Sequence, residues 1–450
     1  MKFLCHAGPW SAVYLSSIVR QISNENCCAI LSAHKKIDES GVWAAYYNFL
    51  SEYKNVKFLA TVEDEDIIAR CRLLRNIGRD ESLLHLNSMR DAIRTVFDEY
   101  EPDVVLSETI DSYIMDLMYF ESLKRNIPFI GLIAVFVNGY FRVSARGEHN
   151  CMRSPGAQEV SDVLQVLENK SYLPDFVRKD KKNPTLSILR KWLRNIIKIP
   201  YFFLKRYVSG DFYNYHYWQS VIISKQWLHF RPRFEIGNKN WLDSLSVVNK
   251  PVIYLPLQMI PEATVDYWCE TTDVIDYDNS LLKFIDSHQE LHFLIKEHPN
   301  VIGYRNPSLY DRLSKLFNVT ICPTQVESNS LFEHYDAVLV WTGTVGFETV
   351  LRGKPALCFS RPYYFPNEDY FKLIRLNTSS AEIVEYIDQC GNGLSVEQKR
   401  ELVSHLLSGV DKGRLIVDGS WNPSSDSDNK EMILLADSLK RYIDSKLQIC

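Results

Sequence analysis

The sequence lacks the long apolar runs and the paired cysteines that mark membrane-spanning and disulfide-rich proteins. Its longest apolar stretch, from Phe129 to Val137, is roughly half the length of a membrane span. The apolar run that follows Met1 stops at His6, which is too short for a secretory signal. The 10 cysteines include no CxxC pair, so a zinc ribbon is not indicated and free thiols are expected. These absences predict a cytoplasmic protein, or one attached to the inner face of the cytoplasmic membrane.

The chain also lacks a large excess of either charge. Its 51 lysines and arginines stand against 56 acidic residues, which gives a net charge of -5. A protein that binds nucleic acid over its whole surface would be basic, so no nucleic-acid partner is expected. A hydrophobic content of 46% over 450 residues is typical of a globular protein with two or three domains.

Several catalytic signatures are missing as well. The sequence has no HExxH metalloprotease motif, no GxSxG nucleophile elbow and no Walker A loop. DxD patterns occur at residues 64–66, 276–278 and 426–428, but such matches arise by chance among 56 acids. We therefore expect neither a metal site nor another cofactor.

Two stretches of the chain alternate short apolar segments with amphipathic ones. In the first stretch, strands are predicted at 2–6, 28–31, 56–60, 104–107 and 129–135. In the second, strands are predicted at 251–256, 291–296, 319–322, 337–341 and 356–359. Near-continuous apolar strands that alternate with helices are typical of parallel α/β sheets. The sequence therefore predicts an α/β protein with two doubly wound, Rossmann-like domains facing across a cleft, with ligands at the carboxyl ends of the strands.

The predicted domains are separated by a basic, aromatic-rich segment. We expect an N-terminal domain at 1–171, a helical insertion and linker at 172–249, a C-terminal domain at 250–425 and a final amphipathic helix at 426–450, with an irregular connection at 411–428. Ten lysines and arginines lie between Arg178 and Arg206, against one acid. Two interpretations fit this pattern: a helix lying on an anionic membrane, or an insertion that packs its apolar face on the protein.

The first candidate cluster follows the predicted strand at 251–256. The loop there carries Gln258, Glu262 and Asp266, and a carboxylate at this place could trap an oxocarbenium-like centre. A helix start with Glu262 in its first turn would explain the same pattern. Gln258 is expected to line the cleft.

Two further clusters follow later strands of the second stretch. Lys296, His298 and Pro299 come directly after a strand and suit a phosphate, although a capped turn would explain them equally well. The second is formed by Thr342, Gly343, Thr344 and Glu348. Its glycine and hydroxyls at a helix start suit an anion, and its glutamate suits ribose hydroxyls. A tight turn capped by a threonine is the alternative.

The first stretch offers a weaker set of candidates. Glu108 and Asp111 follow the strand at 104–107, and Glu108 could orient or deprotonate an acceptor hydroxyl. Capping by Ser107 or Asp111 is the alternative interpretation. His6, at the end of the first strand, is a further candidate for lining the cleft.

Together these motifs resemble glycosyltransferases of the GT-B type, in which two Rossmann-like domains enclose the active site. The resemblance is closest to bacterial capsule and surface-polysaccharide biosynthesis proteins, including the retaining β-Kdo transferases, which use CMP-Kdo. It rests on PLQxxPE…D at 256–266, KEHP at 296–299 and TGTVGFETVLRGKP at 342–355. It implies that His298 holds the donor phosphate, that Thr342, Gly343 and Thr344 bind phosphate or nucleotide, and that Glu348 binds ribose. It also implies a loop acid as nucleophile, with Asp266 the first choice and Glu262 the second.

The resemblance predicts an enzyme that transfers Kdo or a related acid sugar from a CMP-activated donor. The acceptor would be a lipid-linked surface glycan of capsule or lipopolysaccharide O-antigen biosynthesis. The basic segment at 178–206 would then hold the enzyme on the anionic inner membrane. Three alternatives stay open: a CDP-polyol phosphotransferase of teichoic-acid-like polymer synthesis, a nucleotide-sugar epimerase, and a non-catalytic membrane-associated assembly protein.

Overall fold

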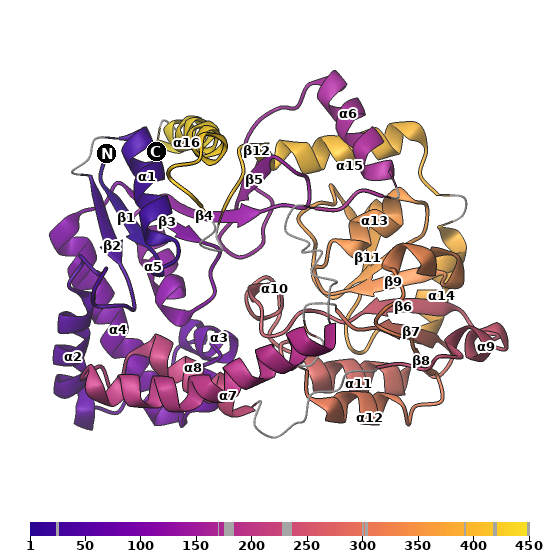
Figure 1. Cartoon of the computed structure of the whole chain (residues 1–450), viewed down its shortest axis with the longest axis horizontal. Helices are drawn as coiled ribbons and strands as arrows, with labels where there is room; N and C mark the ends of the chain where they lie inside the picture. Colours follow the sequence, from indigo (N-terminus) through magenta and orange to yellow (C-terminus); the bar gives the residue numbers. More distant parts are fainter. Residues whose placement is uncertain are drawn as a thin grey trace. The chain divides into compact units, whose positions relative to one another are not determined.

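The computed structural model describes residues 1–23, 27–169, 171–174, 184–226, 236–298, 301, 305–390, 393–416 and 421–447. The chain divides into two compact units, each built on a six-stranded sheet (Figure 1). Unit 1 comprises residues 1–155, 214–216 and 407–450, and unit 2 comprises residues 156–213 and 217–406. This division differs from the expected one, because 407–450 joins unit 1 and 156–171 joins unit 2.

The sheet of unit 1 has the strand order β12-β5-β4-β3-β1-β2. Its strands are β1 (Phe3–His6), β2 (Cys28–Leu31), β3 (Val104–Glu108), β4 (Phe129–Ala134), β5 (Tyr140–Val143) and β12 (Val410–Lys412). The strands β2, β1, β3 and β4 pair in parallel, and β5 runs antiparallel to both of its neighbours. Because the chain moves from β1 to one side and then to β3 on the other, the topological switch point lies between β1 and β3.

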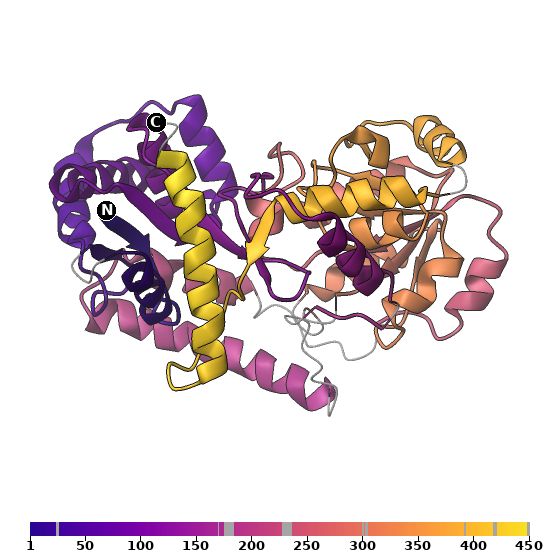
Figure 2. The same cartoon turned by 90° about the horizontal axis from the view of Figure 1, so that it is seen from above.

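Helices cover the sheet of unit 1. They are α1 (Ala12–Ile22), α2 (Val42–Glu52), α3 (Val62–Arg70), α4 (Arg79–Tyr100), α5 (Tyr113–Lys124) and α16 (Asp426–Leu447), with 3-10 turns at Tyr53–Asn55 and Leu74–Asn76. The final helix α16 packs beside α1 and shares its core, as Figure 2 shows for the yellow helix next to the indigo start of the chain. Residues from both ends of the sequence therefore build one core.

Two expectations for this unit were wrong. The segment 56–60 is not a strand: it is irregular, Leu59 is 95% exposed, and the capping box of Thr61 and Asp64 starts α3 directly after it. The connection expected to be irregular at 411–428 begins inside β12 and ends inside α16. Both β5 and β12 were missed, because these short strands lack a continuous apolar run.

The sheet of unit 2 has the strand order β11-β10-β9-β6-β7-β8, with every pairing parallel. Its strands are β6 (Val252–Pro256), β7 (His292–Lys296), β8 (Val319–Ile321), β9 (Ala337–Val340), β10 (Ala356–Cys358) and β11 (Phe371–Leu373). The chain moves from β6 outward through β7 to β8, and then returns to the other side of β6 with β9. The switch point of unit 2 thus lies between β6 and β9.

The helices of unit 2 complete a doubly wound fold. They are α6 (Ala157–Glu168), α7 (Pro184–Val208), α9 (Trp241–Ser246), α10 (Ala263–Asp266), α11 (Tyr277–Ser287), α12 (Pro307–Leu313), α13 (Val345–Leu351), α14 (Ser380–Gln389) and α15 (Val396–Ser408), with α8 (Tyr215–Gln226) beginning in unit 1 and 3-10 turns at Ser328–His334 and Glu368–Tyr370. The predicted fold class, two Rossmann-like α/β domains, is confirmed.

Candidate functional site

Three of the predicted clusters lie at the switch point of unit 2. Gln258 follows β6, His298 follows β7, and Thr342 follows β9; the order β9-β6-β7 makes these strands neighbours. All three strands are parallel, so their carboxyl ends share one edge of the sheet. The residues of these strands are almost all buried, so the positions of the loops that follow them are set by the core.

The loop after β6 contacts the turn after β9 directly. The Gln258 side-chain amide lies against Gly343, where an added Cβ would sit 3.0 Å from the amide nitrogen. Thr342 Oγ1 donates a hydrogen bond to the Thr264 carbonyl oxygen over 3.1 Å, and Tyr364 donates one to the Gly343 carbonyl oxygen over 2.6 Å. The first and third clusters of unit 2 are therefore brought together, and Gln258 lies with the predicted donor-binding residues.

A buried ion pair supports the end of β7, and the sequence analysis missed it. Glu297 accepts hydrogen bonds from Arg305 Nε over 2.6 Å and from the Tyr310 hydroxyl, and both side chains of the ion pair are fully buried. Glu297 also accepts from the backbone N–H of His298 over 2.6 Å, and Arg305 Nη2 donates to the Gln258 carbonyl oxygen over 2.5 Å. This network fixes the backbone of the β6 and β7 loops together. The only feature of the sequence that pointed to this ion pair was a glutamate directly after an apolar strand.

Lys296 and His298 can both bind a phosphate, but burial affects the protonation of each side chain. Burial lowers the pKa of the His298 imidazole to about 4, so the ring is neutral at pH 7 and would bind a phosphate through an N–H donor. Burial also lowers the pKa of the Lys296 ammonium. Within the described part of the chain, no hydrogen bond or ion pair reaches that ammonium. Pro299 lies outside the described residues.

The turn after β9 leaves two further polar groups available. Thr344 is the N-cap residue of α13, but its side chain makes no capping hydrogen bond. Glu348 lies in the first turn of α13, and burial raises the pKa of its carboxyl group. Neither side chain has a hydrogen-bond partner among the residues that the structure describes. A cation, a hydroxyl and a carboxyl group without hydrogen-bond partners among the described residues thus follow strands that end at one edge of the sheet, where α/β proteins bind ligands.

The two candidate nucleophiles differ in accessibility. Glu262 is the N-cap residue of α10 rather than part of its first turn, is partly exposed, and accepts a hydrogen bond from Thr264 Oγ1 over 2.7 Å. Asp266 ends α10 and is only 3% exposed. Accessibility therefore favours Glu262 for direct contact with a substrate.

Unit 1 has its own group of predicted residues at its switch point. His6 ends β1 and Glu108 ends β3, the two strands that flank this point. His6 Nε2 and Glu108 Oε1 are buried and have no hydrogen-bond partner among the described residues. Burial lowers the pKa of His6 to about 4 and raises the pKa of Glu108.

Asp111 does not share this environment. It pairs with both terminal nitrogens of Arg72, over 2.6 and 3.2 Å, and its side chain is half exposed. The N-cap residue of α5 is Ser112, so the alternative interpretation of capping by Ser107 or Asp111 was wrong. The role of Asp111 in this structure is to hold Arg72.

A row of rings in unit 1 was also missed. The rings of His34 and His216 are 4.7 Å apart, and those of His216 and Trp10 are 6.3 Å apart. Trp10 is 49% exposed. Because residues 214–216 join unit 1 from a distant part of the sequence, no local pattern could have placed His216 here.

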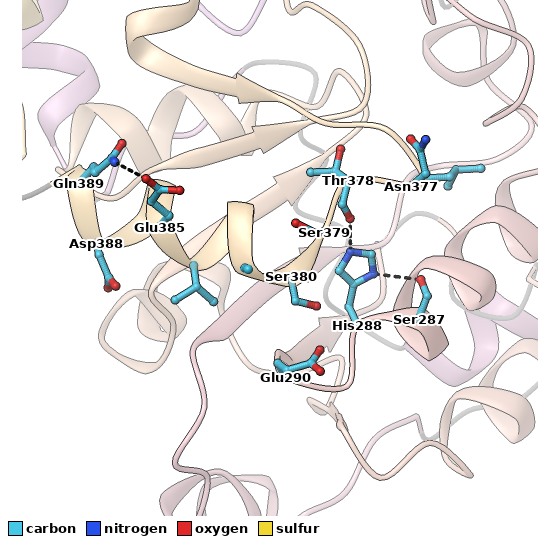
Figure 3. A pocket seen from close by; sticks show the side chains of 13 residues that line it. Ser287, His288, Glu290, Asn377, Thr378, Ser379, Ser380, Glu385, Asp388 and Gln389 are labelled. Carbon is cyan, nitrogen blue, oxygen red and sulfur yellow. Dashed lines mark hydrogen bonds between the residues drawn. The ribbon is translucent and has the colours of Figure 1, made fainter.

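A separate hollow of about 970 Å³ lies between the end of α11 and the start of α14 (Figure 3). Its central His288 contacts the Thr378 carbonyl oxygen over 2.7 Å and the Ser287 hydroxyl over 3.0 Å. None of the sequence-predicted site residues lines it. We assign no function to this hollow.

No group of histidine, cysteine and acidic residues suited to holding a metal ion occurs among the described residues. None of the helices in the described ranges is long and apolar enough to cross a membrane.

Comparison with known families bears on this same part of the chain. Residues 200–366 match the family described as Capsule polysaccharide biosynthesis protein. This span contains all three motifs at 256–266, 296–299 and 342–355. The resemblance inferred from those motifs is therefore confirmed over more than a third of the sequence. No match was found among curated proteins.

Solved structures with some likeness span the whole chain. A β-Kdo 2,7 transferase, KpsC of Thermosulfurimonas dismutans, is 14% identical, with 97% of this chain and 99% of that chain covered and a TM-score of 0.38. A UDP-GlcNAc 2-epimerase of Neisseria meningitidis is 13% identical over 100% of both chains, with a TM-score of 0.23. Anabaena HepE, in complex with UDP, is 8% identical over 100% of both chains, with a TM-score of 0.30. These scores are low, so the fold assignment rests on the strand order of the chain itself.

Proposed function

We propose that this chain is a glycosyltransferase of surface-polysaccharide biosynthesis that takes a sugar from a CMP-activated donor, Kdo or a related acid sugar. One observation carries the proposal. Lys296 ends β7, and Thr344 and Glu348 follow β9 on the other side of β6; all three lie inside the segment that matches the capsule family, and their side chains have no hydrogen-bond partner among the described residues. Polar side chains that the protein leaves without hydrogen bonds at a switch point are available to a ligand.

The chemistry of the site suits a nucleoside monophosphate as leaving group. A CMP-sugar carries a single phosphate, which one ammonium and a few N–H or O–H donors can stabilise without a metal. In this proposal Lys296 and the N–H of neutral His298 bind the phosphate, together with Thr342, Gly343 and Thr344. The carboxyl group of Glu348 accepts hydrogen bonds from ribose hydroxyls.

Transfer with retention requires two displacements. In the first, a carboxylate attacks the anomeric carbon, the bond between that carbon and the phosphate oxygen breaks, and CMP leaves with the electron pair. We favour Glu262 over Asp266 as this carboxylate. The acceptor hydroxyl then attacks the same carbon and the carboxylate leaves. We assign removal of the hydroxyl proton to Glu108, because burial raises the pKa of its carboxyl group and so makes it a stronger base.

Unit 1 would bind the acceptor, a glycan carried on a lipid. The exposed ring of Trp10 offers an apolar face to a sugar. His6 Nε2, which has no hydrogen-bond partner among the described residues, is the hydrogen-bonding group that we assign to the acceptor.

A donor screen on the full chain tests the proposal. We expect release of CMP from CMP-Kdo in the presence of a Kdo-ended acceptor, and a lower rate in Lys296→Met. Release of CMP from CDP-glycerol instead would favour the polyol-phosphate alternative. No turnover of either donor, with no nucleotide bound, would favour a non-catalytic assembly protein.

The nucleophile is tested separately by mass spectrometry of the protein after brief exposure to CMP-Kdo. Glu262→Gln should abolish formation of a glycosyl-protein adduct, whereas Asp266→Asn should retain it if it folds. Loss of the adduct in Asp266→Asn alone, with a parental melting temperature, would reverse this assignment.

A further inference from the structure

The helix α7 presents an apolar stripe to solvent. The stripe recurs at steps of three and four residues, the spacing of one helix face, and comprises Leu186, Leu189, Leu193, Ile197, Tyr201, Leu204 and Val208. Each of these residues is exposed, from 39% for Leu189 to 83% for Val208. We refer to these seven residues as the α7 stripe.

The opposite face of α7 carries the buried residues of the helix and contacts the turn after it and α8. Asn195 and Arg206 are buried there, and Arg206 Nε donates a hydrogen bond to the Phe212 carbonyl oxygen over 2.8 Å. Phe202 on this face stacks on Tyr217, with ring centroids 5.9 Å apart. The buried contacts of α7 therefore lie on one face of the helix, and the α7 stripe lies on the other, exposed face.

Charge along α7 is entirely of one sign. The helix contains no aspartate or glutamate. Arg190, Arg194 and Lys198 follow each other at steps of four residues, so they form one row along the flank of the stripe. Both arginines are exposed. An apolar face bordered by cations complements a surface that is apolar inside and anionic outside.

We propose that the α7 stripe docks on an anionic lipid bilayer, with α7 lying in the plane of the membrane surface. The apolar side chains would enter the boundary between headgroups and acyl chains, and the row of cations would meet the anionic headgroups. No helix among the described ranges could span the bilayer, so the contact would be peripheral. The inference rests on α7 alone and does not depend on the proposed transferase activity. The cations expected at 178–182 lie outside the described residues.

Flotation of the full chain with lipid vesicles tests this inference. We expect binding to vesicles of phosphatidylglycerol and phosphatidylcholine, weaker binding to pure phosphatidylcholine, and release of much of the protein as salt rises. The double variant Leu193→Glu and Ile197→Glu should weaken binding by about tenfold or more, because it places carboxylates in the stripe. The matched control is Leu59→Glu and Val62→Glu, which adds the same charge at two highly exposed apolar sites of unit 1 and should bind as the parent does.

Two results would overturn the inference. One is equal binding by the two double variants, which would make net charge rather than the α7 stripe responsible. The other is an absence of binding to anionic vesicles at low salt. If that absence came with a dimer that the Leu193→Glu and Ile197→Glu variant dissociates, a second copy of the chain would be the occupant of the stripe.

Discussion

Replacing Glu297 by glutamine tests the network that supports the end of β7. The substitution keeps the size of the side chain but removes its charge, and Arg305 is left fully buried opposite a neutral group. The next carboxylate, Asp278, is 3.8 Å from Arg305, and burial raises its pKa. Removing one partner of a buried ion pair costs about 3–5 kcal/mol of unfolding free energy. Since a domain is stable by only about 5–15 kcal/mol, the loss should be large.

Urea unfolding measures this loss of unfolding free energy, and two further variants serve as controls. Glu368→Gln removes the same charge from an exposed pair with Arg361 and should change the unfolding free energy by less than about 1 kcal/mol. The double variant Glu297→Gln and Arg305→Met removes the stranded charge and should recover much of the stability. It leaves an amide oxygen to accept hydrogen bonds from Tyr310.

The same substitution should reach the ligand site through the backbone. Glu297 holds the N–H of His298, so the glutamine variant should also weaken CMP binding while it still folds. If Glu297→Gln unfolded within about 1 kcal/mol of the parent, the buried pair would not support β7 as the distances imply.

Three further predictions concern the two switch points. Lys296→Met should weaken CMP binding by about 10- to 100-fold and raise the melting temperature, because it removes a buried charge without a described partner. Gly343→Ala should weaken CMP binding by about 3-fold or more, because its Cβ would lie 3.0 Å from the Gln258 amide nitrogen, which must then move. The pKa of His6 is about 4 instead of 6.5, so between these values the unfolded chain binds a proton that the folded chain does not. Parental stability should therefore fall by about 2 kcal/mol more than that of His6→Gln between pH 7 and pH 5, in parallel urea titrations.

Each of these predictions has a matched control or a contrary result. Lys283→Met removes an exposed lysine of α11 and should alter neither binding nor melting, whereas an equal effect would point to net charge. Gly156→Ala adds a Cβ with nothing within 4 Å and should bind CMP normally. Parallel pH profiles for the parent and His6→Gln would mean that His6 is not held neutral by burial.

The strand ends of unit 2 could be predicted from sequence because their signal is local. Buried parallel strands are continuous apolar runs, and the clusters led by Gln258, Lys296 and Thr342 each follow such a run. The same rule failed at 56–60, where an apolar run exposes Leu59 and stays irregular. An apolar segment forms a strand only where a neighbouring strand is available to pair with it, and hydrophobicity alone does not predict that neighbour.

The rest of the site depends on partners that are distant in sequence. Arg305 reaches Glu297 from beyond the loop after β7, and His216 joins Trp10 across some two hundred positions. Such pairs have no spacing rule, so only a folded chain brings them together. The choice between Asp266 and Glu262 as nucleophile could not be made from the sequence for the same reason, because the burial of Asp266 depends on how α10 packs.

Calorimetric titration of the full chain with CMP, CDP, UDP and GDP tests the central claim most directly. We predict that CMP binds with a dissociation constant below about 1 mM, and that Lys296→Met weakens it while Lys283→Met does not. Absence of binding by all four nucleotides at millimolar concentration would contradict the assignment of the unit 2 switch point as a nucleotide site.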